Sequence, residues 1–484
     1  MPTLAPLALA LLALVDGPPA RPPSPAEVVS ALETAIGDAV AKTEVSVVAI
    51  TRVRNANTEE TTAIRGRNPM APVPDPTANP FGLSQPSAPD YFAMPGDYGA
   101  GVVIGDRGEI LTSYHLLRGS AFIRVRAVDR QEFDAEIIAA DPRSDLAVIA
   151  PREAPGVAPP RLKALAIGDA STLRRGSFVV ALGNPYNAAR DGRASASWGI
   201  VANTARRLEP GATETRQPTQ QFRHQPTLLQ LDTKLNQGMS GGAVVNLRGE
   251  LVGITTTGGN PSGLDGQAGY AVPMDALGRR IVEALRRGRE VEYGMLGIGL
   301  DTANGTSRVQ SVRPGSPADL ADLVQNDEIL AVGDRPVADR EELSLAISSV
   351  GVGEPVKLRV RRGGLLLEKA VWMAKFPPER FAITTAKSAS WRGLRVDFTS
   401  VMISPTIDAE PSEALSRGGV GVVDVESGSL ADQAGLARNQ VIAEVEGKPI
   451  RTPAEFARAV DGQKGPVTLT TRQGREPDRT VVVK

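Results

Sequence analysis

Apolar residues occur along the chain in short runs that are separated by Gly, Pro, Asp or Asn. Runs of this length indicate β-strands, and their close spacing favours antiparallel sandwiches or barrels over alternating strands and helices. The strands predicted in the first part of the chain span residues 45–53, 101–104, 109–113, 121–126, 133–139, 146–150, 177–182, 198–203, 227–232, 243–246 and 250–257.

Two longer helices are predicted beside these strands. The first begins after Ser24, because Pro25 suits the first helical position and Glu27 completes a capping box with Ser24. Apolar residues then recur every four positions and give this helix one apolar face, formed by Val28, Leu32, Ile36 and Val40. The second helix, at 274–288, carries four arginines and is interpreted as a connector between domains.

An internal repeat occupies the C-terminal part of the chain, with an offset of 113 residues. The run GSPAD at 315–319 recurs as GSLAD at 428–432. The same offset relates Leu323, Asn326, Ile329, Val332 and Pro336 to Leu436, Asn439, Ile442, Val445 and Pro449. Each copy is predicted to contain a strand, a short helix, a hairpin, a second helix at 340–349 or 453–460, and a final strand. The sequence therefore predicts two copies of one module.

Composition excludes several classes of protein. A chain of 484 residues is expected to form about three domains. Its 54 Lys and Arg residues are balanced by 55 Asp and Glu residues, so no nucleic-acid partner is expected. The absence of Cys excludes disulfides, iron–sulfur clusters and cysteine nucleophiles. The sequence has only two His, His115 and His224, which excludes a His-rich metal site, and we predict neither a metal nor a cofactor.

The N-terminus carries an apolar run at 4–15 that is too short to span a bilayer as a helix and matches the core of a signal peptide. Small and turn-forming residues follow it at 16–20. No Lys or Arg precedes the run, so a disordered start is the alternative interpretation. We expect residues 1–24 to be a signal peptide and leader. The mature protein is then exported to the periplasm or cell envelope, with a membrane contact only through an uncleaved N-terminus.

Three polar residues lie in segments that could together carry out acyl transfer. His115 ends the run ILTSYH, Asp145 directly precedes a predicted strand, and Ser240 lies in the glycine-rich turn NQGMSGGA. Taken singly, a His in a half-buried turn, an Asp at a turn and a Ser in a hairpin loop are ordinary structural residues. Their combination in one chain is what indicates chemistry.

The reaction requires all three residue types. A Ser hydroxyl needs a base with a pKa near 7, which His supplies, and the imidazole needs a carboxylate that fixes its tautomer. The glycines beside Ser240 would let the backbone N–H groups of Gly238 and Ser240 face a developing oxyanion. The order His, Asp, Ser along the chain fits a chymotrypsin-like arrangement.

The chain resembles the HtrA/DegP family of serine proteases in the runs 99–115, 141–149, 181–186, 231–254 and 270–273. The resemblance implies a mainly β protein, in which a chymotrypsin-like double β-barrel is followed by two α+β PDZ domains. We expect the double barrel at 25–290, the first module at 291–376 and the second module at 385–484. A Pro-rich loop insertion at 54–98 falls where the family carries a long regulatory loop.

On this resemblance His115 is expected to be the general base, Asp145 the carboxylate that orients it, and Ser240 the nucleophile. The implied activity is ATP-independent endoproteolysis of unfolded or damaged proteins, and the lack of a phosphate-cradling loop fits it. Gln237 and Met239 stand where the family has Pro and Asn. A proteolytically weak chaperone or peptide-binding scaffold of the same fold is therefore the alternative.

PDZ domains bind extended C-terminal peptides by strand addition, and a turn of backbone N–H groups holds the terminal carboxylate. In the first module this turn is expected to comprise Met295, Leu296, Gly297 and Ile298. In the second module it is expected at 393–396, where Arg395 occupies the glycine position. The family implies a homotrimer or larger homo-oligomer whose partners are unfolded protein substrates and apolar C-terminal peptides.

The specificity pocket is expected to be formed by the segment before the nucleophile and the strand after it, with Leu235, Ile254, Thr255 and Tyr270 as its residues. Leu235 matches a family position that holds an aliphatic residue, which predicts cleavage after Val, Ile, Ala or similar side chains. Lys234 leaves a preference for acidic side chains as the alternative. Burying its unpaired ammonium is costly, so we expect that charge to lie in solvent. His224 is interpreted as a surface or packing residue.

Overall fold

The computed structural model describes residues 22–54, 98–185, 191–206, 227–256, 269–300, 305–377, 382–386, 390–402, 418–473 and 477–484. The predicted signal peptide, nearly all of the Pro-rich insertion at 54–98, and His224 lie outside the described residues.

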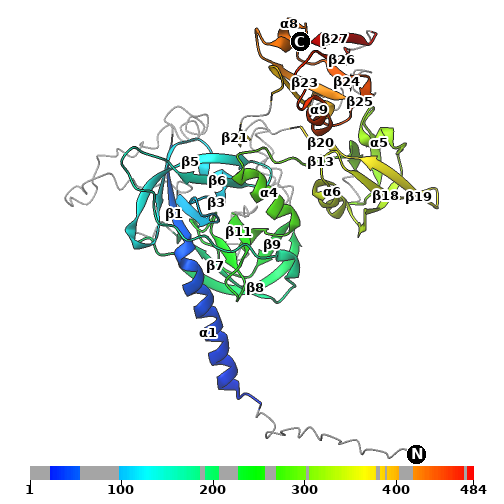
Figure 1. Cartoon of the computed structure of the whole chain (residues 1–484). Helices are drawn as coiled ribbons and strands as arrows, with labels where there is room; N and C mark the ends of the chain where they lie inside the picture. Colours follow the sequence, from blue (N-terminus) through cyan, green and yellow to red (C-terminus); the bar gives the residue numbers. More distant parts are fainter. Residues whose placement is uncertain are drawn as a thin grey trace, which may run out of the picture.

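Two closed barrels form the first part of the protein (Figure 1). The first barrel contains β1 (Val47–Arg54), β2 (Tyr98–Val103), β3 (Ile110–Ser113), β4 (Ser120–Arg126), β5 (Glu132–Asp141) and β6 (Leu146–Pro151). The second contains β7 (Phe178–Gly183), β8 (Ser195–Arg206), β9 (Leu228–Leu231), β10 (Ala243–Val245), β11 (Leu251–Thr256) and β12 (Gly269–Pro273). Antiparallel pairing runs β5-β4-β1-β2-β3-β6, closed by β5 with β6, and β10-β11-β12-β9-β8-β7. The mainly β double barrel expected from the sequence is therefore confirmed.

Helices pack on the barrels at two places. The capping box predicted at Ser24 is present, with Glu27 N donating to Ser24 Oγ at 3.3 Å, and it starts α1 (Pro25–Thr43). Only the C-terminal half of α1 packs on the core, and Val28 and Val29 are exposed, so the predicted apolar face is only partly buried. The helix extends away from the double barrel in Figure 1. The shorter helices of this region are η1 (Glu44–Ser46), α3 (Tyr114–Leu117), η2 (Val128–Arg130), η3 (Ala170–Thr172) and α4 (Ala276–Arg286).

The first module contains β13 (Gly294–Met295), β14 (Ile298–Leu300), β15 (Val309–Val312), α5 (Pro317–Leu320), β16 (Glu328–Val332), β17 (Arg335–Pro336), α6 (Arg340–Ser349), β18 (Pro355–Arg362), β19 (Leu365–Trp372) and β20 (Ala374–Lys375). The second contains β22 (Leu394–Phe398), η6 (Thr399–Met402), β23 (Val420–Val425), α8 (Leu430–Gln433), β24 (Val441–Val445), β25 (Lys448–Pro449), α9 (Pro453–Val460), β26 (Val467–Arg472) and β27 (Arg479–Val483). The two longer helices occupy the residues predicted from the repeat. Each module has its own apolar core.

The segment between the two modules returns to the double barrel. There β21 (Ile383–Thr384) pairs antiparallel with the edge of β5. Within the described residues, no helix is both long enough and apolar enough to cross a membrane.

Candidate active site

His115 is positioned by the end of β3 and the start of α3. The strand ends at Ser113 and not at His115, because Tyr114 N donates to the carbonyl oxygen of Asp145 at 2.9 Å and the chain then turns into α3. His115 therefore lies on the first turn of a short helix. Its side chain is 24% exposed, so the imidazole is reachable from solvent.

The imidazole of His115 is paired with a buried carboxylate. His115 Nδ1 lies 2.7 Å from Asp145 Oδ2, and His115 N donates to Asp145 Oδ1 at 2.8 Å. Burial lowers the pKa of His115, but the negative charge of Asp145 and its hydrogen bond outweigh burial and leave the pKa above its ordinary value. With Nδ1 held by the carboxylate, Nε2 is the nitrogen left to exchange a proton.

Thr256 also contributes to this pair, and the sequence did not single it out. Thr256 Oγ1 donates to Asp145 Oδ2 at 2.8 Å from the end of β11. The carboxylate thus accepts from the His115 backbone, the imidazole and a hydroxyl of the other barrel. A Thr at the end of a strand is too common a feature to indicate this role without knowledge of the fold.

Ser240 lies in what we call the nucleophile turn, residues 236–242. Gly238 has φ 93° and Gly241 has φ 80°, conformations that residues with a side chain rarely adopt. A Cβ atom at Gly238 would lie 2.1 Å from the carbonyl oxygen of Asn184. Ser240 O accepts from Ala100 N at 2.8 Å, which fixes the turn against the first barrel.

Thr255 supports the nucleophile turn from below. Its hydroxyl donates to Met239 O and accepts from Gly242 N at 2.9 Å, and its carbonyl oxygen accepts from Gly241 N at 2.8 Å. Because Thr255 and Thr256 are consecutive, β11 holds both the nucleophile turn and the carboxylate of Asp145. The end of β11 therefore contacts both the turn that contains Ser240 and the carboxylate that pairs with His115.

Two amides in the nucleophile turn are available to an incoming oxygen. Within the described chain, neither Gly238 N nor Ser240 N donates a hydrogen bond. Met239 does not cover them, because its side chain is buried on Gly183, where an added Cβ would lie 3.0 Å from the Met239 sulfur. The Met239 side chain, which stands where the family has Asn, therefore packs on Gly183 and leaves both amides uncovered.

The residues expected to form the specificity pocket differ in burial. Leu235 and Tyr270 are half-buried, and Leu235 packs on Gly269, where an added Cβ would lie 2.7 Å from Leu235 Cγ. Ile254 and Thr255 are both fully buried. Leu235 and Tyr270 are therefore the accessible members of the set. Lys234, which precedes Leu235, is exposed as expected.

The turn predicted to bind a carboxylate in the first module is built around a glycine with positive φ. Gly297 has φ 81°, and an added Cβ would lie 2.2 Å from the Cβ of Ser316. Gly297 O accepts from Arg313 N at 2.9 Å, and Leu296 O accepts from Ala318 N at 2.9 Å.

The second module has the same turn, two residues earlier than expected. Gly393 has φ 83°, and an added Cβ would lie 2.2 Å from the Cβ of Ser429, the repeat partner of Ser316. Gly393 O accepts from Glu426 N at 2.8 Å and Arg392 O from Ala431 N at 3.2 Å, which again matches the repeat. The expected register was therefore wrong, because alignment by sequence alone did not locate the contact with Ser429. The glycine is present at 393.

The second turn differs from the first in the residue before its glycine, which is Arg392 where the first module has Leu296. Its guanidinium donates to carbonyl oxygens of Gln463, Gly465 and Val483 and lies 4.6 Å from the ring centroid of Trp391. Arg395 instead pairs with Asp424 on the neighbouring strand. The second turn thus carries a charged side chain at the position where the first has a buried apolar one.

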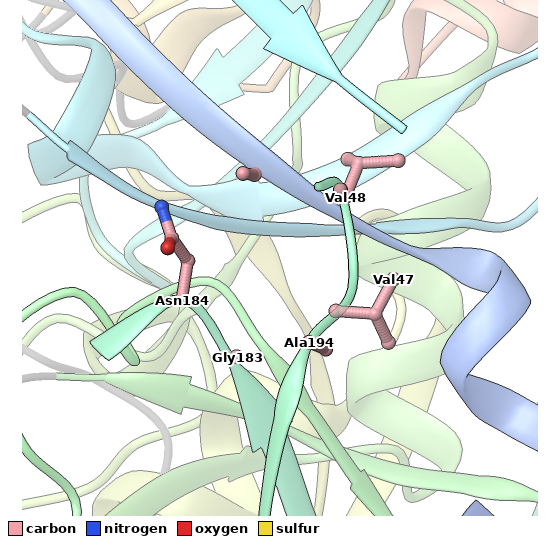
Figure 2. A pocket seen from close by; sticks show the side chains of 7 residues that line it. Val47, Val48, Gly183, Asn184 and Ala194 are labelled. Atoms are coloured by element: carbon pink, nitrogen blue, oxygen red, sulfur yellow. The ribbon is translucent and has the colours of Figure 1, made fainter. Parts of the chain in front are cut away.

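A small pocket lies between β1 and the end of β7 (Figure 2). It is lined mostly by Val47, Val48, Gly183 and Ala194, and by Asn184, whose backbone N donates to Gly238 O at 3.3 Å. None of the three predicted catalytic residues lines it. It is a gap in the packing behind the nucleophile turn, and we assign it no ligand.

Comparison with known proteins agrees with this geometry. Residues 99–254 match the trypsin-like peptidase domain, and residues 294–371 and 421–473 each match a PDZ domain. The chain is 31% identical over 408 residues to the periplasmic pH-dependent serine endoprotease DegQ of Escherichia coli (strain K12), covering 80% of this chain and 81% of DegQ. It is 26% identical over 388 residues to the periplasmic serine endoprotease DegP of that strain, covering 78% of this chain and 74% of DegP.

Solved structures agree in fold. The HtrA-type protease AlgW with tripeptide matches with a TM-score of 0.50 and 21% identity, over 72% of this chain and 99% of that chain. A double barrel with a trypsin-like peptidase domain and two PDZ domains defines the class as a serine endopeptidase. The chain belongs to the HtrA/DegP family.

Proposed function

We propose that this protein is exported to the periplasm or cell envelope and there cleaves unfolded or damaged proteins without ATP, through an acyl-enzyme. The observation that carries the proposal is the His115–Asp145 pair beside a glycine turn that contains Ser240 and two unoccupied amides. The relatives DegQ and DegP of Escherichia coli are periplasmic serine endoproteases, which supports this location.

In the proposed mechanism Ser240 Oγ attacks the scissile carbonyl carbon, and His115 Nε2 accepts the hydroxyl proton. Asp145 stabilises the resulting imidazolium through the 2.7 Å contact with Nδ1. Gly238 N and Ser240 N donate to the oxyanion of the tetrahedral intermediate. His115 then protonates the leaving amine, and a water molecule, activated by the same imidazole, hydrolyses the acyl-enzyme.

The activity is tested with unfolded casein and a fluorophosphonate probe that labels an activated Ser. We expect the full chain to cleave casein and to be labelled, and Ser240→Ala to do neither. If the chain suppressed aggregation of unfolded proteins without cleavage or labelling, it would instead be the chaperone or scaffold considered from the sequence. That result would overturn the proposal.

For substrate selection we propose a shallow apolar pocket formed by Leu235 and Tyr270, with Ile254 and Thr255 behind it. The exposure of Lys234 supports this proposal, because a solvated ammonium offers no buried partner for an acidic substrate side chain. We expect cleavage after Val, Ile or Ala in an unfolded substrate, mapped by mass spectrometry. A majority of cuts after Asp or Glu would make Lys234 the specificity residue.

We further propose that the first module binds apolar C-termini through residues 295–298 and that this binding raises protease activity. The second module is expected to contribute less, because Arg392 replaces the apolar residue of its turn. We propose that the protease domain spans 25–290, the first module 291–376 and the second module 385–484. We also propose that the protein forms a homotrimer or larger homo-oligomer. Calorimetry with an apolar C-terminal peptide tests the ranking, which equal affinities of the two modules would contradict.

A further inference from the structure

The residues 141–145, which we call the aspartate turn, are shaped by the carboxylate of their own first member. Asp141 Oδ1 accepts from Arg143 N at 3.3 Å, and Asp141 Oδ2 accepts from Ser144 N at 3.0 Å and Ser144 Oγ at 2.6 Å. At the other end, Asp145 has φ 56°, a left-handed conformation that is uncommon for a residue with a side chain. The position of Asp145 therefore depends on how firmly Asp141 is held.

A further donor to that carboxylate comes from outside the barrels. Tyr293 Oη donates to Asp141 Oδ2, and Tyr293 is only 3% exposed. Tyr293 directly precedes β13, the first strand of the first module. The segment that leads into the first module thus reaches the base of the aspartate turn.

The last residues of the first module contact the same turn. Phe376 N donates to Tyr293 O at 2.8 Å, so the two chain ends of the module are tied together. The guanidinium of Arg143 lies 3.6 Å from the ring centroid of Phe376 and 5.4 Å from that of Tyr293. Such cation–π contacts are favourable and are strongest when desolvated, and Arg143 is buried.

The segment between the modules holds the strand that leads into the turn. β21 pairs Ile383 with Ala140 and Thr384 with Ala139, immediately before Asp141. Thr385 Oγ1 donates to Ile138 O at 2.7 Å. The edge of β5 is therefore covered by residues that follow the first module.

The longer helix of the first module, α6, is also attached to the double barrel. Arg280 of α4 donates to the carbonyl oxygens of Ser348 and Ser349 at the end of α6, at 2.8 and 2.9 Å. Leu345 of α6 packs in the core of the double barrel. α6 is thus attached to the same face of the double barrel as the segment that contains Tyr293.

The second module joins this junction through a buried cation. Lys375 Nζ lies 2.8 Å from Glu290, before the first module, and 2.8 Å from Asp397 of β22. Burial lowers the pKa of Lys375, but Asp397 and Glu290 outweigh burial and raise it, so the ammonium stays charged.

We propose that Tyr293 is a positioning residue for the catalytic carboxylate: through Asp141 it holds the aspartate turn in shape, so that seating of the first module sets the Asp145–His115 pairing. The inference rests on the proposed function, because it assigns Asp145 to catalysis. It adds to the proposed function by placing the influence of the modules on the base of the triad.

The test uses Tyr293→Phe in the full chain, which removes one hydroxyl and keeps the ring beside Arg143. The pKa of His115 is measured by NMR on protein with isotope-labelled histidine rings. The chain has only two His, so only two rings are observed, and His224→Gln shows which of them is His115. We expect the pKa of His115 to fall in Tyr293→Phe, because a loosened Asp145 no longer offsets burial of the imidazole. For a short unstructured peptide we expect kcat to fall about tenfold with KM unchanged, as for a lost hydrogen bond to a charged group.

Two variants separate positioning from general loosening. Ser144→Ala removes another donor to the same oxygen and is expected to lower the pKa of His115 as well, with a less than multiplicative effect in the double variant. Thr471→Val is the matched control. It removes a buried hydroxyl of the second module that donates to Arg479 O at 3.1 Å within the β26–β27 hairpin, and it leaves both the aspartate turn and Phe376 untouched. We expect its His115 titration and kcat to equal those of the unaltered chain.

An unchanged His115 titration and kcat in folded Tyr293→Phe would overturn the inference, as would an equal shift in Thr471→Val. If Tyr293→Phe unfolds, the His115 titration is measured in Ser144→Ala and Thr385→Val instead. Ser144→Ala removes a hydrogen bond to Asp141, and Thr385→Val removes one to the strand that leads into the aspartate turn. The titration is independent of turnover. A chain that titrates as expected but cleaves nothing would therefore contradict the proposed function, and not the positioning role of Tyr293.

Discussion

The nucleophile turn and the aspartate turn meet in one site but are supported differently. The nucleophile turn is held from within the double barrel, by glycines with positive φ and by the hydroxyl of Thr255. The aspartate turn takes part of its support from the ends of the first module, through Tyr293 and Phe376. The difference implies that the modules can change the strength of the base while the nucleophile and its amides stay in place.

The largest effect is expected when the nucleophile itself is removed and both turns are left intact. Ser240→Ala should lower turnover on unfolded casein by about 10⁴- to 10⁶-fold, because no other hydroxyl replaces Oγ. Circular dichroism and thermal unfolding should match the unaltered chain. Cleavage by the folded variant at the original rate would show that Ser240 is not the nucleophile. His115→Ala should behave similarly.

A substitution in the nucleophile turn should act without changing the base. In Gly238→Ala the new Cβ would lie 2.1 Å from Asn184 O, at a backbone with φ 93°, so the turn must shift and its amides with it. We expect kcat to fall about 10²- to 10³-fold, as for a lost oxyanion donor. The acid limb of the kcat/KM profile should not move. A moved limb would mean that the two turns are not independent.

A substitution next to Asp145 should change the pH dependence of the reaction, in contrast to a substitution in the nucleophile turn. Thr256→Val removes the 2.8 Å hydrogen bond to Asp145, and we expect kcat to fall about tenfold. The unaltered acid limb should lie on the high side of the ordinary His pKa, because Asp145 raises the pKa of His115 and only the neutral imidazole accepts a proton. Loosening Asp145 lowers that pKa, so the limb should move to lower pH. Stopped assays between pH 5 and 9 measure it, and a limb shifted upward would contradict the assignment.

The smallest effect on basal activity is expected from a matched pair in the modules. Gly297→Val and Gly393→Val each place a Cβ about as close to a Ser, and each removes a glycine with positive φ. We expect both to leave hydrolysis of a short peptide within about twofold, as for distant, independent sites. Stimulation by an apolar C-terminal peptide should be lost only in Gly297→Val. Loss in both variants would show that the second module shares the role.

Much of the architecture was predictable because it depends on local patterns. Short apolar runs between turn residues indicated the barrels, and the capping box at Ser24 located the start of α1. The repeat predicted the helices at 340–349 and 453–460, and in the structure each follows a residue whose side chain caps it, Asp339 or Thr452. His115, Asp145 and Ser240 were predicted because the chain has only two His and because the runs around these three residues resemble the HtrA/DegP family.

The remaining features depend on contacts between residues far apart in sequence. Thr256 and Tyr293 reach the aspartate turn across 111 and 152 residues, and no local pattern marks a Thr or a Tyr for that contact. The register of the second carboxylate turn was misjudged for the same reason, since Gly393 is defined by its contact with Ser429. The sequence by itself determined which residues can do chemistry and where elements begin. Only the tertiary structure decided which hydroxyls hold Asp145, because long-range packing brings together groups whose own surroundings in the chain are ordinary.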